Sequence, residues 1–370
     1  MYATTEGTRR FVDAQPEPRR DHYRQSADGL WLPSIGVGTY LGEATDADDT
    51  HYRSAFTRAW TMGCNIFDTA INYRHQRSER ALGSWLHQAF DNGTLDRDEI
   101  ILCTKGGFVP FDSVVPDDPR KWVYETYIAS GIAHANDFAA NYQHCIAPGF
   151  LEAMIDQSRS NLGVECIDVY YLHNPETQHI SFSHQTFRAR ILDAFETLED
   201  AVANGLIRSY GMATWAAFRS LPDAPDYLSL TEMVGINCAG CRTGSPLPLR
   251  AASLQSVYDR SLCALENQQI QERIHQRHQR GGRTRLDGDD QRLVASGQIS
   301  HADHGAACRI PARSGSRTRK MAINSRARLP GVTTALVGMK QIDHVRDNLA
   351  LLDIPPADGD DIRRMFKFGE

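Results

Sequence analysis

The sequence contains no run of apolar residues that approaches the length of a membrane span. Its polar beginning, MYATTEGTRRFVDAQPEPRRDHYRQ, lacks the apolar core of a secretory signal. The net charge is −6 and the isoelectric point is near 6.2, so nothing favours nucleic acid or an anionic membrane as a partner. We expect a cytoplasmic protein whose residues 1–28 form a loose N-terminal leader.

Cysteine is present but shows no spacing typical of a disulfide framework or a zinc site. Cys64, Cys103 and Cys166 lie in apolar runs, where buried free thiols are expected. Cys238 and Cys241 form a single CxxC without a second pair, so a metal or redox role there is the less favoured interpretation. The sequence therefore predicts no metal site and a reducing compartment.

From Leu30 onward, short apolar segments alternate with helical stretches. The predicted strands are SIGVGTY, CNIFD, EIILCTK, CIDVYYLH and LIRSYGMAT, and the predicted helices lie near 47–62, 78–91, 149–162 and 184–204. This alternation indicates parallel βαβ units in the α/β class, with strands buried on both faces. The first strand is not followed by Gly-x-Gly-x-x-Gly, which argues against a Rossmann domain. A chain of 370 residues can form one barrel, but periodicity alone does not exclude an open doubly wound sheet.

An aromatic-rich insertion at 106–148 follows the third of these strands. Loops at the carboxyl ends of barrel strands form active sites, so we interpret it as a lid on the substrate side. The alternative is a surface elaboration without a role in function.

Four polar residues stand at or just beyond the carboxyl ends of successive strands: Asp68, Tyr73, Lys105 and His173. Each alone has an ordinary explanation as a helix cap, a packed ring, a solvated amine or a structural imidazole. Together they form a usable acid, because an ammonium lowers the pKa of a neighbouring phenol and a carboxylate holds the ammonium in place. The imidazole can orient a carbonyl oxygen. Side chains cannot supply a hydride, so a nicotinamide cofactor is required for reduction.

These segments resemble the aldo-keto reductase family. The run GCNIFDTAINYRHQRSERALG is similar to the family's signature around its catalytic Asp and Tyr, ILCTK to the strand of its Lys, and VYYLHNPE to that of its His. SIGVGTYLG, GLIRSYGMATW and GVTTALVGMKQIDHVRDNLALL resemble its first, fifth and eighth strands. The resemblance covers about residues 30–236 and 330–352, and it implies a (β/α)₈ TIM barrel over 29–352 with a tail at 353–370.

By this resemblance, Tyr73 is the general acid of an NADP(H)-dependent reduction of an aldehyde or ketone. Lys105 and Asp68 tune Tyr73, and His173 positions the carbonyl. The resemblance also implies a set of cofactor-binding residues: Gly38, Thr39, Tyr40 and Asp68 at the nicotinamide and its ribose, Met339, Lys340, His344 and Arg346 near the adenosine end, and Asn348 at the adenine.

Two features leave the cofactor partly open. Lys340, His344 and Arg346 are candidates for the 2′-phosphate of NADP, so NADP is favoured over NAD. The three residues also fit an ordinary solvated helix face, so NAD stays open as the less favoured cofactor. After the fifth strand the family commonly has Ser-Asn, whereas this chain has Ala213 and Thr214. Thr214 can make one hydrogen bond to the carboxamide rather than the usual set.

Between residues 238 and 328, where the family has its sixth and seventh strands, the barrel pattern stops. Residues 239–328 contain fifteen Arg, one Lys, no Phe and no Trp. Disorder fits this composition, and a natural insertion is one interpretation. With permitted codons, reading Arg242–Ser261 one base later can give GLDHHYRFVQLPYSLSMTD, and Arg280–Ser296 can give EAAGRGLMVMTSASL. Both resemble the missing strands, so we favour a compensated frameshift, which resequencing codons 230–335 would test.

Three hypotheses on function follow. The leading one is the NADPH-dependent carbonyl reductase. The second is a nucleotide-binding regulatory protein of the same fold, and the third is an inactive product of the altered reading frame. Fold alone does not separate the first two.

Overall fold

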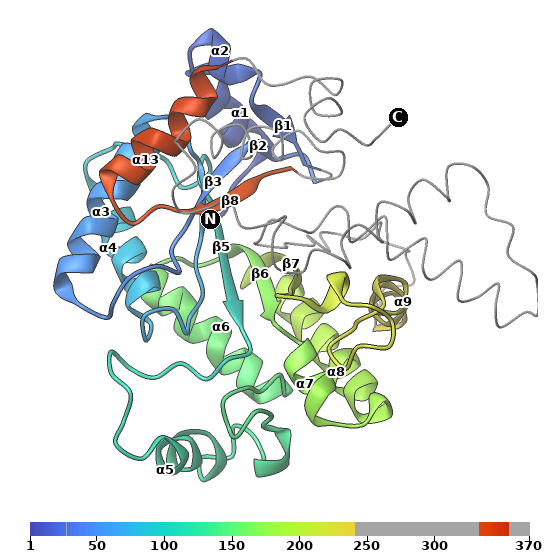
Figure 1. The fold of residues 1–370 in the computed structure, drawn as a ribbon. Helices are drawn as coiled ribbons and strands as arrows, with labels where there is room; N and C mark the ends of the chain where they lie inside the picture. Colours follow the sequence, from blue (N-terminus) through green and yellow to red (C-terminus); the bar gives the residue numbers. More distant parts are fainter. Residues whose placement is uncertain (27, 241–332, 355–370) are drawn as a thin grey trace, which may run out of the picture.

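The computed structural model describes residues 1–26, 28–240 and 333–354, and the statements below concern this part of the chain. At its centre is a parallel sheet of six strands in the order β7-β6-β5-β4-β3-β8 (Figure 1). The strands are β3 (Ile35–Gly38), β4 (Ile66–Asp68), β5 (Ile101–Gly106), β6 (Ile167–His173), β7 (Ile207–Ala213) and β8 (Ala335–Gly338). All five strands expected before residue 214 are confirmed, and so is the last strand.

The position of β8 is informative because its residues lie 300 positions beyond their partners in β3, as the pair Ile35 and Ala335 shows. It pairs with β3 in parallel, and Gly38 is the partner of both Asp68 in β4 and Gly338 in β8. A first strand between the second and the last strand is the order found in a (β/α)₈ barrel. The α/β class and the barrel arrangement are therefore confirmed. The segment 241–332 lies outside the described residues, so the irregularity expected at 238–328 and the frameshift hypothesis stay predictions.

The strand β3 is crowded at Gly36, which explains the glycine at this position. A Cβ added at Gly36 would lie 2.7 Å from Leu336 Cδ2 and 2.8 Å from Ile66 Cγ2. Only a residue without a side chain leaves room for both neighbouring strands at this point. The glycine thus sets how closely β8 and β4 approach β3.

The helices lie outside the sheet and contact one another in the order α13–α3–α4–α6–α8–α9. They are α3 (Asp46–Thr61), α4 (Arg77–Asp91), α6 (Pro148–Leu162), α8 (His184–Ala203), α9 (Leu230–Gly240) and α13 (Ile342–Leu349). Thr45 caps α3 by accepting a hydrogen bond from the Asp48 N–H, and Pro148 begins α6 where no N–H is needed. The four helices predicted between residues 47 and 204 are confirmed.

The expectation of a loose leader at 1–28 is wrong. Residues of this segment form α1 (Thr5–Asp13), α2 (Glu17–Arg20) and β1 (Tyr23–Gln25), which pairs antiparallel with β2 (Trp31–Pro33). Phe11 and Tyr23 are buried, and the Ala3 N–H donates to Asp168 Oδ1 at 2.7 Å. A few apolar side chains on a polar segment are enough to anchor it when the barrel offers a complementary surface.

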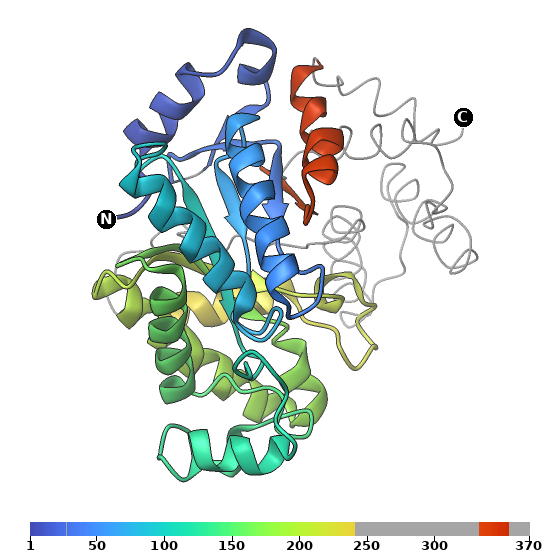
Figure 2. The same ribbon diagram turned by 90° about the vertical axis from the view of Figure 1, so that its left-hand side faces the viewer.

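The insertion after β5 forms a compact unit at the opposite end of the molecule from α1 and α2 (Figures 1 and 2). It contains α5 (Pro119–Val123), a π-helical turn (Tyr124–Ile128) and a 3₁₀ turn (Ala135–Asp137), and α7 (Glu176–Ser181) follows β6. Short 3₁₀ turns also occur at Ala217–Arg219 and Ala350–Asp353. The apolar side chains of the insertion, among them Val109, Val123, Tyr127 and Phe138, form a cluster with Phe150 of α6. The insertion is therefore packed rather than extended.

Four cysteines of the described residues are free thiols. Cys64, Cys103, Cys145 and Cys166 are buried and free, which confirms the prediction for three of them. Cys238 lies in the last turn of α9, whereas Cys241 lies outside the described residues. Within the described ranges, no set of three metal-ligating side chains gathers, and no helix has the length and apolar character of a membrane span.

Candidate active site

The carboxyl ends of β4 and β5 place two opposite charges in contact in the interior. Lys105 Nζ donates to Asp68 Oδ2 at 2.6 Å and to the backbone oxygen of Thr69 at 2.7 Å. Both charged side chains are almost completely buried. Residues of parallel strands that end at one edge of a sheet meet there, which is why residues 37 positions apart pair.

The protonation of this pair follows from its geometry. Burial opposes the charge on Lys105, but the carboxylate of Asp68 and the phenol of Tyr73 outweigh it and raise the pKa of the lysine. Burial raises the pKa of Asp68, and the contact with Lys105 opposes this effect. The ammonium therefore stays protonated at neutral pH beside its carboxylate.

Tyr73 lies against this ammonium. Lys105 Nζ is 5.1 Å from the centroid of the Tyr73 ring, and Tyr73 is buried, with 8% of its surface exposed. The rings of Tyr40 and His173 meet it edge-on, with centroids at 5.1 Å and 5.7 Å. The four residues expected to carry the chemistry are thus brought together.

His173 is neutral in this site. Its pKa is far below the usual value because the ring is buried, and the charge of Lys105 lowers it further. The Phe108 ring meets the imidazole edge-on at 5.0 Å. A neutral imidazole has one N–H to donate, which suits an uncharged carbonyl oxygen.

A second buried histidine, His144, lies beside His173, and its pKa can be tested through the pH dependence of stability. Burial lowers its pKa to about 4, from an ordinary value of 6.5. A depressed pKa contributes stability that is present above pH 6.5 and is lost as the pH falls toward 4, because the unfolded chain binds the proton first. We expect the free energy of unfolding, measured with urea, to fall between pH 6.5 and pH 4 by about 3 kcal/mol more in the wild type than in His144→Gln.

Parallel stability curves for these two proteins would show that His144 is charged or exposed in the fold. His173 is present in both proteins, so only the part of its titration that depends on the charge of His144 enters the comparison.

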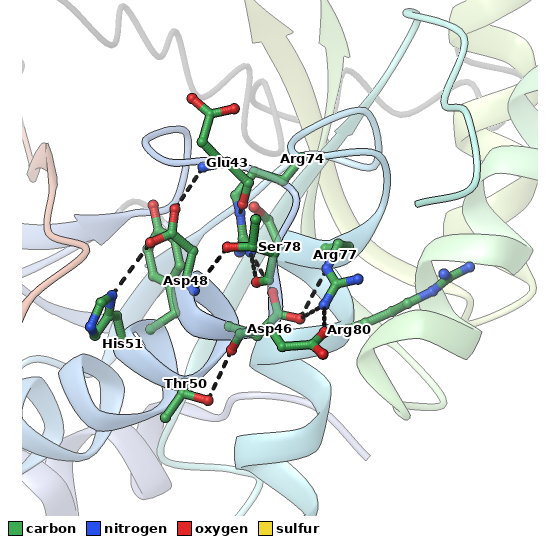
Figure 3. Close-up of polar contacts among 12 residues, drawn as sticks. Glu43, Asp46, Asp48, Thr50, His51, Arg74, Arg77, Ser78 and Arg80 are labelled. Atoms are coloured by element: carbon green, nitrogen blue, oxygen red, sulfur yellow. Dashed lines mark hydrogen bonds and ion pairs between the residues drawn. The ribbon is translucent and has the colours of Figure 1, made fainter. Parts of the chain in front are cut away.

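A cluster of polar contacts ties the chain that follows Tyr73, residues 74–80, to residues 43–51 after β3 (Figure 3). Arg74, fully buried, donates to the backbone oxygens of Glu43 at 2.8 Å and Thr45 at 3.3 Å, and it also pairs with Asp49. Arg74, His75 and Gln76 all have left-handed φ angles of 52°, 55° and 70°. Such angles cost about 1–2 kcal/mol per residue outside glycine. The buried guanidinium stabilises this turn and ties it to the loop after β3.

The residues expected at the nicotinamide lie beside this site. Gly38 ends β3 next to Asp68, and the Thr39 hydroxyl donates to the backbone oxygen of Asp68 at 3.1 Å. Tyr40 is 59% exposed, and Thr214 is buried one residue beyond β7, where Ala213 pairs with His173. The hydroxyl of Thr39 is thus already engaged within the protein.

The polar atoms at the centre of the site fit a bound dinucleotide. Asp68 Oδ1 and His173 Nδ1 are buried and have no hydrogen-bond partner among the described residues. A buried carboxylate oxygen without a donor is costly unless a ligand supplies one. A ribose hydroxyl is a suitable donor for Asp68.

The basic residues beyond β8 are placed unequally. Lys340 Nζ is 2.9 Å from Asp48 Oδ1, and Arg346 makes an exposed contact of 3.4 Å with Asp343. The backbone N–H of Glu43, and after it Lys340, lowers the pKa of Asp48 to about 2 against the effect of burial. His344 is exposed, whereas Met339 and Asn348 are buried. Lys340 therefore already has a carboxylate partner.

Sequence reasoning did not identify Arg74, His144 or Phe108. Arg74 could have been noticed as the neighbour of Tyr73, but its side-chain contacts come from a loop about 30 residues away. His144 and Phe108 lie in the insertion, where no motif marks them. Their importance depends on contacts with His173.

Comparison with known proteins gives consistent results. The sequence model of the Aldo/keto reductase family matches residues 34–229. The chain is 28% identical over 195 residues to D-threo-aldose 1-dehydrogenase of Pseudomonas sp., which is 51% of this chain and 52% of that protein. It is 27% identical over 188 residues to the NADP(+) aldo-keto reductase yakc of Schizosaccharomyces pombe, which is 50% of this chain and 44% of that protein. The matches thus span about half the length of these relatives.

A solved structure extends the likeness to the fold. Aldo-keto reductase AKR11C1 of Bacillus halodurans superposes with a TM-score of 0.54 at 18% identity, covering 94% of this chain and 96% of that chain. At this identity the likeness shows the fold alone.

Proposed function

Because this chain belongs to the aldo/keto reductase family, we propose that it reduces an aldehyde or ketone to an alcohol with NADPH. The single observation that carries the proposal is the buried Lys105–Asp68 pair beneath the Tyr73 ring, with neutral His173 on the other side. This arrangement combines a proton donor, a fixed positive charge and an uncharged hydrogen-bond donor. Each of these groups lowers the barrier to carbonyl reduction, by donating the proton, stabilising the charge that develops and orienting the carbonyl oxygen.

In the proposed mechanism, Tyr73 gives its phenolic proton to the carbonyl oxygen of the substrate. NADPH, when bound, supplies the hydride. Lys105 favours the phenolate that remains on Tyr73, because its ammonium lies 5.1 Å from the ring and no water screens a buried charge. Asp68 holds the ammonium in this position.

His173 orients the substrate in this proposal. Its neutral imidazole donates to the carbonyl oxygen, which directs that oxygen toward the Tyr73 hydroxyl. A protonated imidazole next to Lys105 would be unfavourable, which agrees with the low pKa of His173. The ring is held edge-on between Tyr73 and Phe108, so its orientation is restricted.

The proposed cofactor residues are those at the ends of β3, β4, β7 and β8. Asp68 Oδ1 would accept a ribose hydroxyl, Thr214 would contact the carboxamide, and Asn348 the adenine. Gly38 and Tyr40 border the same region, and Thr39 shapes it through its bond to Asp68. The 2′-phosphate would be bound by one or more of Lys340, His344 and Arg346.

The proposal for NADP predicts a preference that depends on salt. We expect NADPH to bind about fivefold more tightly than NADH at low ionic strength, the factor given by ~1 kcal/mol for a partly exposed ion pair. The difference should shrink as salt is added, because charges near the surface are screened. Fluorescence titration with both cofactors measures it, and equal affinities at low salt would contradict the assignment.

A steady-state assay tests the function as a whole. The absorbance of NADPH is followed with a panel of aldehydes and ketones, with aldoses included because one relative is named for an aldose. Consumption of NADPH with a matching yield of alcohol supports the reductase. Tight binding of NADPH without turnover across the panel would favour the nucleotide-binding regulatory alternative instead.

We also propose that the insertion at 106–148 covers the substrate. The support is that it leaves the carboxyl end of β5 and places the Phe108 ring 5.0 Å from the His173 ring. A cytoplasmic location is part of the same proposal, supported by four buried cysteines that remain free thiols.

A further inference from the structure

A chain of hydrogen bonds leads from the insertion to the backbone of His173. His144 is fully buried, and its Nε2 lies 2.8 Å from the backbone oxygen of His173. Its Nδ1 lies 3.1 Å from Nε2 of Gln178. An amide nitrogen only donates, so Nδ1 of His144 accepts and Nε2 carries the hydrogen. His144 therefore donates to His173.

The orientation of the Gln178 amide is fixed independently. Arg190 Nη1 donates to Gln178 Oε1 at 2.6 Å, and a guanidinium cannot accept. The Gln178 amide nitrogen also donates to the backbone oxygen of His144 at 3.1 Å. The sense of donation thus runs from Arg190 on α8, through Gln178 on α7, to His144 in the insertion and to His173 on β6.

The contact between His144 and His173 depends on Gly107, which has a φ angle of 146°. A Cβ at this position would lie 2.8 Å from the His173 oxygen and 3.0 Å from His144 Nε2. Phe108, the next residue, meets both imidazole rings edge-on at 5.0 Å. The backbone and the ring of His173 are therefore both contacted by the insertion.

The chain turns sharply directly after His173, because Asn174 has a left-handed φ of 47°. The carbonyl that precedes this turn is the one that His144 binds. Holding it fixes the direction in which the Cα–Cβ bond of His173 leaves the strand. A displacement of about 1 Å in a group that orients a substrate can cost on the order of a hundredfold in rate.

We infer that His144 is a positioning residue for His173, and that the insertion is part of the catalytic architecture as well as a cover. The inference rests on the proposed function of His173 as the group that orients the carbonyl. His144 itself contacts no reacting atom.

Imidazole spectra of the full-length protein test the geometry without any substrate. Long-range ¹H–¹⁵N correlation should show His144 with its hydrogen on Nε2, and His144→Leu should shift the imidazole resonances of His173. The opposite tautomer of His144, or unchanged His173 resonances in His144→Leu, would overturn the inference.

Kinetics then test the consequence, with 4-nitrobenzaldehyde as the probe carbonyl. We expect kcat of His144→Leu to fall on the order of 10- to 100-fold, with NADPH affinity unchanged within about twofold. His144→Gln should recover most of the activity, because its side-chain amide can donate to the same oxygen. An equal loss in both variants, or none in His144→Leu, would show that the hydrogen bond does not position His173.

His22 provides the matched control. It is also buried, and its ring contacts Ser34 Oγ at 2.9 Å and the backbone oxygen of Ile354 at 2.7 Å. His22→Leu should lower the free energy of unfolding while leaving kcat per folded molecule unchanged. A fall in kcat as large as in His144→Leu would indicate a general structural effect. If the wild type reduces no carbonyl, the proposed function fails, and the spectra still decide whether His144 holds His173.

Discussion

Replacing Tyr73 by phenylalanine is expected to lower kcat for carbonyl reduction by about 10²–10⁴-fold. The change removes one oxygen and keeps the ring that packs against Tyr40, His173 and the Lys105 ammonium. In the proposed mechanism the hydroxyl acts only when the proton is transferred. The loss should therefore fall on kcat rather than on the affinity for NADPH.

Steady-state kinetics and fluorescence titration with NADPH measure these two effects separately. Tyr124→Phe, at a 56% exposed position on the insertion, is the matched control and should keep the wild-type rate. If Tyr73→Phe retains most of its carbonyl reduction, another group supplies the proton and the assignment is wrong.

The second large effect is expected from breaking the buried ion pair. Lys105→Met should lower the free energy of unfolding by about 3–5 kcal/mol, because it leaves Asp68 charged, buried and without its partner. The same change removes the hydrogen bond from Lys105 Nζ to the backbone oxygen of Thr69. Removing both charges in Lys105→Met/Asp68→Leu should recover much of the stability, since no uncompensated charge remains.

Urea unfolding of the two single variants and the double variant gives the coupling energy between the residues. Lys121→Met is the control, because Lys121 and Glu125 form a solvent-exposed pair at 3.8 Å. The free energy of unfolding of Lys121→Met should lie within about 0.5 kcal/mol of the wild-type value. A Lys105→Met variant as stable as the wild type within ~1 kcal/mol would show that the pair is not buried as described.

Both predictions concern residues that the sequence alone had singled out. The alternation of apolar strands and helices is local information, because helix and strand periodicity arise within about a dozen residues. It predicted β3 to β7 and the helices between them. It also placed Asp68, Lys105 and His173 at strand ends. Since parallel strands end at one edge, their convergence followed from the fold class, and the resemblance to a family supplied their roles.

Other features depended on contacts between distant parts of the chain. The leader is packed because Ala3 and Phe11 find partners on the barrel, which composition does not reveal. Lys340 was a candidate for phosphate, but it pairs with Asp48, 292 residues away.

The sequence by itself determined which residues stand at the strand ends, and with them the candidate acid, because strand periodicity is encoded locally. Only the tertiary structure decided how these residues are held. Hydrogen bonds from Arg74 hold the turn after Tyr73 against the loop after β3. His144, which lies 29 positions before His173 in the sequence, donates a hydrogen bond to the backbone oxygen of His173. Hydrogen bonds of this kind depend on where two backbones meet in space, and no spacing along the chain encodes that position.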